Sequence, residues 1–503
     1  MIKNPLFFIS LLFNIFLIYK QHSALQVSMF EFVQVFYFGF IASNLFFLII
    51  STYVMYKNYD IFNFIEKNVF KKQAAVIIGS IIISTVISLI PISVMIIFKN
   101  PNFQRIFVLK GIVHFFIIWT LSNLLACVVG STIGTLCKNG FSMILSFVFF
   151  GLFIKYSYGS YGSYIKQLFN IYDDFTFAGM NYICGRIFNT FYCLDKLFIL
   201  LISLLILSIS CFINKRIRKL YSTIFLILTL FSTCINIHLS SIYKSTNLNQ
   251  YDPIKNVNYI VESYDMDIKL GNKFKNAANI NLSINTNSNN VVMLLDDLFK
   301  IDELYVNGKP CDFHHEHNKL NIIRSFTEGE KVHISVKYKG YVDVANNLGA
   351  PVYYVSKYAT NLPISSFYWY PKASKTSLIN FNVSIKASNS IYSNLDMCSS
   401  SDSLYKFRGK SSGLNIFSGQ YKKYYENNIE YIIPTNSNLE SFKLNMQDYI
   451  NNLNSKHFSK KELETLNANK FKKVICGIWD INFNVQFTKP YIQIFEDTLI
   501  INY

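Results

Sequence analysis

Long apolar segments fill the first half of the chain and predict a bundle of membrane-spanning helices. Seven segments within residues 5–242 are dominated by Ile, Leu, Phe and Val over 15 to 30 residues each. A helix needs about 20 residues to cross a hydrocarbon core roughly 30 Å thick. The first and fifth segments are short, so they would be tilted, re-entrant or longer than drawn. The expected spans are Pro5–Tyr19, Phe30–Tyr56, Gln73–Phe98, Phe107–Leu136, Phe141–Tyr156, Asp195–Ile213 and Leu220–Ile242.

Short runs of alternating apolar and polar residues begin at about Asn258. ANINLSINT at residues 278–286 and KVHISVKYKG at residues 331–340 have the period of two that is typical of half-buried strands. Asn307-Gly308 lies between two such runs and predicts a hairpin turn, since both residues tolerate positive φ. From Ser437 a helix-like run precedes two last strand-like runs. This half is expected to be an all-β sandwich or saddle-shaped sheet with a short α/β tail.

Composition sets the expected domain boundaries. Up to Tyr243 the chain is mostly apolar, whereas Asn, Lys, Ser, Tyr and Asp become common after Lys244. The fold class expected is therefore an α-helical polytopic membrane domain of about six or seven spans, followed by an all-β extracytoplasmic domain. The expected domains are a transmembrane domain at residues 1–243, a β-domain at residues 244–436 and an α/β tail at residues 437–503.

Basic residues in the short loops predict how the chain is oriented. Residues 1–243 hold 18 Lys and Arg against 6 Asp and Glu, and residues 244–503 hold 29 against 24. Cations beside apolar spans mark cytoplasmic loops and meet anionic lipid, so this surplus does not indicate nucleic-acid binding. The loops at residues 57–72 and 215–219 are both rich in Lys and Arg. We therefore expect a multi-pass protein of the cell membrane with a cytoplasmic N-terminus and an extracytoplasmic C-terminal domain.

Some of the polar residues within the predicted spans could have a function. Asn44, Asn123 and His114 could line a substrate path, because polar groups in hydrocarbon are costly and often functional. A single polar side chain more often forms a hydrogen bond to a neighbouring helix. We favour this second, structural interpretation for all three residues.

The layout of spans and loops resembles the ABC type-2 permeases over roughly residues 1–214. In that family a coupling helix follows the second span on the cytoplasmic side, and KNYDIFNFIEKNVFKKQ (residues 57–73) has that place here. Short outer helices precede the sixth span of the family, where this chain has the aromatic segment at residues 161–192. This chain lacks the usual amphipathic helix before the first span and adds a seventh span. The resemblance implies a coupling loop with candidate residues Lys57, Tyr59, Asp60, Glu66 and Lys67.

The permease resemblance also implies partners. Permeases of this kind work as pairs of six-span halves together with an ATPase. The chain contains no G-x-x-x-x-G-K-[ST] phosphate-binding loop. A separate ABC ATPase subunit, a second permease half and the lipid bilayer are therefore the partners expected.

The order of motifs in the second half resembles the N-terminal β-domain of the aminopeptidase N family of zinc peptidases. LLDDLFKIDELYVNGK is followed by a Glu-Gly-Glu segment, by a strand that ends in Y-x-G, and by a W-Y-P element. The match spans about residues 260–435, and W-Y-P is its most specific part. The motif residues are Asn307, Gly308, Tyr338, Gly340, Trp369, Tyr370 and Pro371.

Catalytic residues do not accompany this resemblance. The family holds zinc through H-E-x-x-H, whose two histidines lie on one helical face. The nearest match is His314-His315-Glu316-His317, but Lys319 stands where the second histidine is needed. Residue 503 falls about where the peptidase domain of the family begins. None of the nine cysteines forms a C-x-x-C pair, so neither a zinc cluster nor a disulfide framework is indicated. No catalytic residue, metal or cofactor is expected.

Three functional hypotheses follow. The first and preferred one is an export permease subunit with an extracytoplasmic binding domain and no enzymatic activity. The second is the non-catalytic anchor and β-domain of a membrane zinc aminopeptidase whose active-site module is lost or encoded on another chain. The third is a membrane-tethered binding or sensing protein, which would need fewer spans.

Overall fold

The structure is a computed structural model with two compact units. It describes residues 5–58, 69–137, 139–157, 169, 171–172, 183, 185–186, 188, 190–213, 219–243, 257–345, 351–364, 367–373, 378–451, 466, 471–478 and 492–502. The helical unit consists of Met1–Phe177 and Gly185–Lys244, and the β-rich unit consists of Ala178–Cys184 and Ser245–Tyr503.

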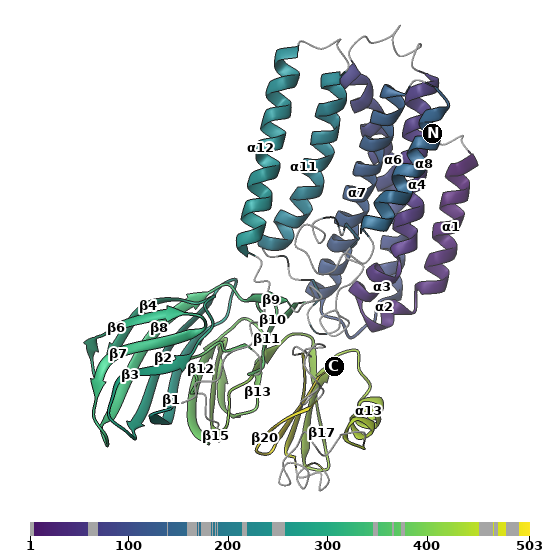
Figure 1. Cartoon of the computed structure of the whole chain (residues 1–503). Helices are drawn as coiled ribbons and strands as arrows, with labels where there is room; N and C mark the ends of the chain where they lie inside the picture. The colour runs from purple at the N-terminus through teal and green to yellow at the C-terminus, as the bar shows by residue number, and fades with distance from the viewer. Residues whose placement is uncertain are drawn as a thin grey trace. The chain divides into compact units, whose positions relative to one another are not determined.

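The helical unit is a set of long helices that run along one another (Figure 1). The helices are α1 (Pro5–Gln21), α2 (Ala24–Val27), α3 (Met29–Val35), α4 (Tyr37–Lys57), α6 (Val69–Phe98), α7 (Arg105–Leu136), α8 (Phe141–Ser157), α11 (Thr190–Ile213) and α12 (Lys219–Tyr243). Five of them (α4, α6, α7, α11 and α12) are long and apolar enough to cross a membrane. Shorter apolar helices occupy Phe7–Gln21 and Phe141–Lys155, where two further spans are predicted.

The span predicted at Phe30–Tyr56 is two helices rather than one. α3 begins after Ser28, whose hydroxyl accepts a hydrogen bond from the backbone N–H of Phe30. It ends at Val35, because Phe36 has ψ near 6° and leaves the helical conformation. The Phe36 ring lies over Gly39 at the start of α4, where a larger side chain would overlap it. The helix is therefore broken at Phe36 within a continuously apolar segment, and hydropathy does not reveal this break.

Helices α4 and α7 pack with their backbones close together. A Cβ atom placed on Gly130 of α7 would overlap the carbonyl oxygen of Leu48 in α4. One turn further on, a Cβ on Gly134 would lie 2.5 Å from the carbonyl oxygen of Thr52. Small residues four apart allow this approach, which supplies van der Waals contact where no hydrophobic effect acts between helices. These two glycines fix the register of the helix pair.

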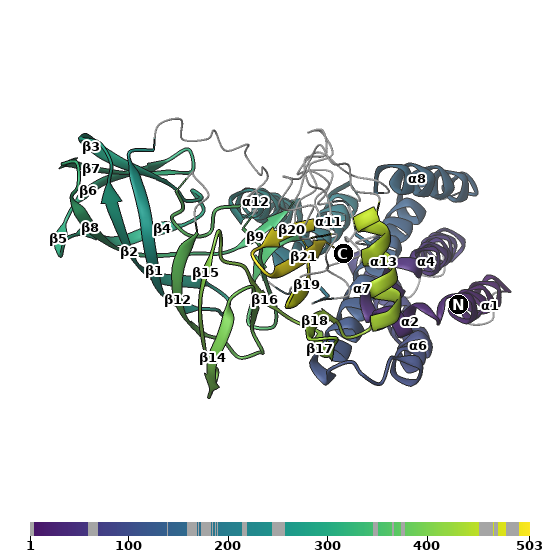
Figure 2. The same ribbon diagram turned by 90° about the horizontal axis from the view of Figure 1, so that it is seen from below.

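The largest element of the β-rich unit is an eight-stranded sheet with the order β14-β15-β12-β1-β2-β8-β4-β5. Its strands are β1 (Tyr259–Lys269), β2 (Phe274–Ile284), β4 (Lys300–Val306), β5 (Lys309–Pro310), β8 (Lys331–Gly340), β12 (Ile379–Lys386), β14 (Asp396–Ser401) and β15 (Leu404–Ser411). β1 pairs with β12 in parallel, and the pairs of β2 with β1 and with β8 are antiparallel. Figure 2 shows β12, β1 and β2 side by side. Buried and exposed residues alternate along the central strands, so one face of the sheet forms the core and the other faces solvent.

Three smaller sheets complete this unit. A three-stranded sheet contains β3 (Ser288–Leu294), β7 (Lys319–Phe326) and β6 (Asp312–Glu316). A five-stranded sheet contains β13 (Tyr392–Ser393), β16 (Ile416–Ser418), β11 (Thr360–Leu362), β10 (Pro351–Val355) and β9 (Asp343–Ala345). The last sheet has the order β17 (Tyr421–Glu426), β18 (Ile429–Pro434), β19 (Lys473–Gly477), β21 (Thr498–Asn502) and β20 (Ile492–Phe495). Several sheets thus stand where the sequence predicts a β-rich region.

The last sheet extends across the boundary predicted at residue 437. β18 pairs in parallel with β19, and α13 (Leu439–Asn451) lies between these two strands in the sequence. β17 and β18 precede residue 437 yet belong to the same sheet as β19, so the predicted α/β tail is not separate from the strands before it. The sequence does not reveal this sheet, because β17 and β18 form an ordinary hairpin and the next strand of the sheet, β19, comes only after α13.

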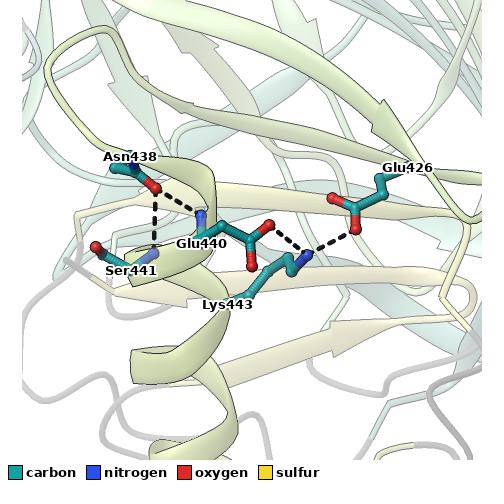
Figure 3. A network of polar contacts seen from close by, with 5 residues as sticks. All are labelled: Glu426, Asn438, Glu440, Ser441 and Lys443. Atoms are coloured by element: carbon teal, nitrogen blue, oxygen red, sulfur yellow. Dashed lines mark hydrogen bonds and ion pairs between the residues drawn. The ribbon is translucent and has the colours of Figure 1, made fainter.

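Helix α13 is fixed to β17 by polar contacts (Figure 3). The Asn438 side-chain oxygen accepts hydrogen bonds from the backbone N–H groups of Glu440 (2.8 Å) and Ser441 (3.4 Å) at the start of the helix. Such a cap satisfies donors that have no partner inside a helix. The Lys443 ammonium lies 2.7 Å from Glu426 of β17 and 2.8 Å from Glu440. Both carboxylates raise the pKa of Lys443, so the lysine is charged at every physiological pH.

Candidate functional site

Buried polar side chains cross-link the helices of the helical unit around α7. Asn123 of α7 accepts a hydrogen bond from the Ser43 hydroxyl of α4 (3.1 Å) and donates one to Ser84 of α6 (2.9 Å). The Trp119 indole N–H, one turn earlier on α7, donates to the carbonyl oxygen of Ser84 at 2.9 Å. Asn123 and Trp119 are fully buried. One asparagine therefore connects three helices.

A second cross-link lies further along the same helices. The Gln73 side-chain amide of α6 donates to Ser210 of α11 (2.7 Å) and to Thr135 of α7 (3.2 Å). The Thr52 hydroxyl of α4 lies 2.9 Å from Ser146 of α8 and 3.1 Å from the Gly130 carbonyl of α7. Ser and Thr are common in apolar helices, so the sequence does not distinguish these residues from others of their kind. Their positions inside apolar segments are the one sign of such contacts.

The other two polar residues predicted within spans are also hydrogen-bonded. The Asn44 amide donates to the Tyr172 hydroxyl at 2.6 Å, and both side chains are buried. The His114 Nδ1 atom lies 2.9 Å from the Tyr192 hydroxyl of α11. Asn44, Asn123 and His114 thus contact other parts of the unit, in agreement with the structural interpretation favoured from the sequence.

Most of the predicted coupling loop lies outside the described residues. Tyr59, Asp60, Glu66 and Lys67 are among those not described, so their part in coupling stays a prediction. Lys57 is the last residue of α4, and its ammonium donates to the Tyr53 hydroxyl one turn earlier. The same ammonium lies 4.9 Å from the centre of the Tyr53 ring. Lys57 is therefore anchored on the surface of its own helix.

The aminopeptidase-like motif residues divide into a turn and a core. Asn307 and Gly308 have φ of 51° and 78° and connect β4 to β5, as the sequence predicts for a hairpin turn. The Asn307 side-chain oxygen accepts the backbone N–H of His333 at 2.8 Å, which ties the turn to β8. Gly340 ends β8 where a Cβ would lie 2.9 Å from the carbonyl oxygen of Leu298. Glycine is needed there because backbone approaches backbone.

The W-Y-P element lies in the interior of the β-rich unit. Trp369 and Tyr370 are buried, and their rings pack at 4.8 Å. The Tyr338 hydroxyl donates to the Trp369 carbonyl at 3.0 Å and accepts from the Asn276 amide at 2.8 Å. The Tyr264 hydroxyl donates to the Pro371 carbonyl at 2.7 Å. These hydrogen bonds hold the W-Y-P element to strands β1 and β8 of the eight-stranded sheet.

Burial explains the ionisation of these tyrosines. It raises the pKa of Tyr338 and of Tyr370 far above the ordinary value, because a phenolate would lose its hydration. A buried tyrosine of this kind donates and accepts hydrogen bonds but does not act as a base near neutral pH. The motif residues therefore serve as packing and not as proton-transfer groups.

The histidine cluster lies on a hairpin. β6 ends at Glu316, and His317 and Asn318 have φ of 54° and 59° in the turn that leads to β7. The His315 Nε2 atom donates to the Leu295 carbonyl at 3.1 Å and lies 3.7 Å from the Asp297 carboxylate. Within the described part of the chain no three His, Cys, Asp or Glu side chains are placed to hold a metal ion. A strand places neighbouring side chains on opposite faces, so this sequence does not supply the helical zinc geometry.

Comparisons with known proteins give a distant structural likeness. No family model matches the chain, and no curated protein matches it by sequence. The M1 zinc metallopeptidase from Deinococcus radiodurans is 10% identical with a TM-score of 0.32, and the match covers 49% of this chain and 60% of that one. A two-domain M1 zinc metallopeptidase mutant bound to L-arginine is 11% identical with a TM-score of 0.33 and the same coverage.

Leukotriene A4 hydrolase from Saccharomyces cerevisiae is a further structural neighbour. It is 9% identical with a TM-score of 0.33, and the match covers 52% of this chain and 44% of that one. The chain thus spans about 60% of the length of the metallopeptidases that it matches. Scores of this size leave the function of the chain to be argued from its own residues.

Proposed function

We propose that the protein is a multi-pass membrane protein whose helical unit is one half of an ABC-type export permease. The observation that carries this proposal is the position of α7 inside the unit, with hydrogen bonds to α4, α6 and α11. A single apolar helix is enough to tether a domain. A helix that is surrounded by other helices and hydrogen-bonded to them stabilises a helix bundle, which tethering does not require.

Burial separates inner from outer helices in a way that suits this proposal. Within the most apolar stretch, 67% of α4, 56% of α7 and 50% of α11 is buried, but only 22% of α6 and of α12. The outward sides of α6 and α12 carry large aliphatic and aromatic residues such as Ile82, Val86 and Phe231. Lipid covers such a surface, and a second copy would cover part of it in a paired permease.

The partners in this proposal are a separate ATPase subunit and a second permease half. Affinity-tagged full-length protein, extracted in mild detergent, is expected to retain an ATPase that hydrolyses ATP in the eluate. The double substitution Glu66→Ala and Lys67→Ala should weaken that association, because the permease resemblance places both residues in the coupling loop. Lys99→Ala with Arg105→Ala, in the next loop of the chain, is the charge-altering control. Extraction without any ATPase, and equal behaviour of the two variants, would reject the permease proposal in favour of a membrane-tethered binding protein.

The β-rich unit is proposed to lie outside the cytoplasm and the N-terminus inside it. Cys398 on β14 is exposed and offers a native reporter of this orientation. A membrane-impermeant maleimide should label it in intact cells, and Cys398→Ser should remove that part of the labelling. Labelling of Cys398 only after the cells are opened would reverse the orientation.

A second candidate is the non-catalytic part of a membrane aminopeptidase. The observation that favours it is that Tyr338, Trp369 and Tyr370, three motif residues far apart in sequence, meet in one core. Under both candidates the chain itself is proposed to have no enzymatic activity, cofactor or nucleic-acid partner. Full-length protein with added Zn²⁺ should therefore leave aminoacyl 4-nitroanilides intact. Hydrolysis that a chelator abolishes would contradict both candidates.

A further inference from the structure

Five lysines form one straight row across the solvent face of the eight-stranded sheet. Lys269 of β1 is directly opposite both Lys386 of β12 and Lys275 of β2. Lys275 is opposite Lys339 of β8, and Lys339 is opposite Lys300 of β4. These five residues, one on each of five adjacent strands, are called the lysine row.

Such a row is unfavourable for the sheet alone. Like charges on directly opposite residues destabilise strand pairing. Lysines on edge strands often prevent aggregation, but all five strands of the row lie between β14 and β5, which are the edges of this sheet. Protection of an edge therefore does not explain the row, and a role in binding does.

A groove follows four of the five lysines in the row, all but Lys300. It has a volume of about 510 Å³, and its lining includes Lys269, Lys275, Lys337, Lys339 and Lys386. Asp267 and Asp302 also line it, so the groove carries a net surplus of three positive charges. The groove is concave and positively charged, as expected for a site that binds anions.

Acidic neighbours neutralise only one side of this groove. Lys339 lies 2.7 Å from Asp302, and Lys337 lies 2.8 Å from Glu303. The Lys339 ammonium holds the pKa of Asp302 below its usual range, so that carboxylate stays charged. Among the described residues, Lys269, Lys275 and Lys386 form no ion pair and are exposed. These three lysines form the open part of the row.

We propose that the lysine row binds a linear polymer that carries repeated phosphate groups and no bases. The distance between neighbouring strands is about 4.8 Å, so five strands extend over roughly 19 Å, too long for one phosphate but suited to a chain of them. Lysine is a compact point charge that binds phosphate oxygens from any direction, whereas arginine would add a planar fork that fixes the orientation of a single carboxylate or phosphate. The row contains lysine alone.

One feature of the groove separates this ligand from nucleic acid. Proteins that bind single strands combine a basic groove with exposed aromatic rings on which bases stack. The single aromatic residue among those that line the groove is Tyr338, which is buried. The ligand is therefore recognised by its phosphates alone. This inference goes beyond the proposed permease function and does not depend on it.

The test uses full-length protein in nanodiscs of zwitterionic lipid and a fluorescently labelled inorganic polyphosphate of about 15 units. The site variant combines Lys269→Gln, Lys275→Gln and Lys386→Gln. The control variant combines Lys309→Gln, Lys331→Gln and Lys357→Gln, which removes the same charge from exposed residues that do not line the groove. Affinity is measured by fluorescence anisotropy between about 20 and 200 mM salt, where screening changes most.

The proposal expects a specific loss in the site variant. Its affinity should fall by at least about tenfold, and the slope of log affinity against log salt should decrease by about 2, close to 0.7 for each lost phosphate contact. The control variant should stay within about threefold of the wild type. Equal losses in the two variants would overturn the proposal, because diffuse net charge would then account for binding.

Three competitors identify the source of the phosphates. Inorganic phosphate should compete only weakly, since it cannot contact the whole row. Oligothymidylate or polyglutamate that binds as tightly as polyphosphate would overturn the proposal in favour of a nucleic acid or an acidic peptide. Binding to vesicles that contain phosphatidylglycerol, without binding to soluble polyphosphate, would overturn the polymer and assign the row to a lipid surface.

Discussion

The two units of this protein have opposite distributions of apolar residues. Among the described residues, 51 large apolar side chains are exposed, and 43 of them belong to the helical unit against eight in the β-rich unit. The helical unit encloses Asn123, Gln73 and Thr52, while the β-rich unit encloses Trp369 and Tyr370. Water does not tolerate an exposed apolar surface of that extent, so the helical unit indicates association with a membrane.

This difference shows which interactions specify each unit. In lipid the hydrophobic effect does not favour one helix arrangement over another. Close backbone packing and interhelical hydrogen bonds therefore specify the arrangement. In water the burial of large rings drives folding, and hydrogen bonds such as that of Tyr338 position them. Substitutions of aromatic, glycine and asparagine residues should therefore have different effects in the two units.

The largest effect is expected in the aromatic core of the β-rich unit. Trp369→Ala should destabilise that unit by about 3–5 kcal/mol, because a buried aromatic side chain is lost and a cavity remains. Tyr358→Ala, at a residue that is 40% exposed, is the matched control and should cost about 0.5 kcal/mol or less. Protease resistance of the β-rich unit on heating measures both. Equal resistance of the two variants would mean that the W-Y-P element does not hold the core.

A somewhat smaller effect is expected where α4 and α7 touch. Gly130→Val should destabilise the helical unit by about 1–3 kcal/mol, because the new methyl groups overlap the Leu48 carbonyl and force the helices apart. Gly79→Val in α6 is the control, since a Cβ at Gly79 has no atom within 4 Å. Retention of the monodisperse peak on size exclusion after heating reports the difference. If Gly79→Val is equally harmful, helix propensity rather than packing limits stability.

The hydrogen bonds of Asn123 should contribute less. Double-mutant cycles of interhelical hydrogen bonds in membranes average about 0.6 kcal/mol. Asn123→Leu should thus cost about 1 kcal/mol, since it removes bonds to two helices. A cycle with Ser84→Ala isolates the bond between α7 and α6, and its coupling free energy should be near 0.6 kcal/mol. A coupling of zero would remove Asn123 from the set of cross-links.

The sequence predicted features that depend on neighbouring residues. The Asn307-Gly308 turn, the apolar segments and the tendency of Asn44 and Asn123 to hydrogen-bond all follow from local pattern. The break at Phe36 was missed, because the residues on both sides of it are equally apolar. Such a break depends on how the aromatic rings pack and not on hydropathy.

The lysine row was out of reach for a different reason. Lys269 and Lys386 are more than 100 residues apart and become neighbours only through the parallel pairing of β1 with β12. A shift of one residue in that register would place one of them on the buried face. Lysines spaced along a sequence do not reveal such a row, because register between distant strands is set by tertiary packing.

The smallest effect concerns the stability of the β-rich unit in acid. Burial of Glu430 on β18 raises its pKa, but hydrogen bonds from Lys423 and Tyr425 outweigh this and leave the pKa below the ordinary value of 4.5. The folded unit therefore binds this proton more weakly than the unfolded chain does. The stability that Glu430 contributes is fully present above about pH 4.5 and is lost as the pH falls through the lower, folded value.

Glu430→Gln should accordingly flatten the loss of stability between about pH 5 and pH 3, by less than about 1 kcal/mol because solvent partly screens the ion pair with Lys423. Lys423→Gln should flatten it in the same direction, since it removes one of the two groups that hold the pKa down. Glu262→Gln, on an exposed position of β1, is the control. Thermal unfolding across this pH range measures all three. If Glu430→Gln leaves the wild-type profile unchanged, the charge of Glu430 is too well hydrated to stabilise this sheet.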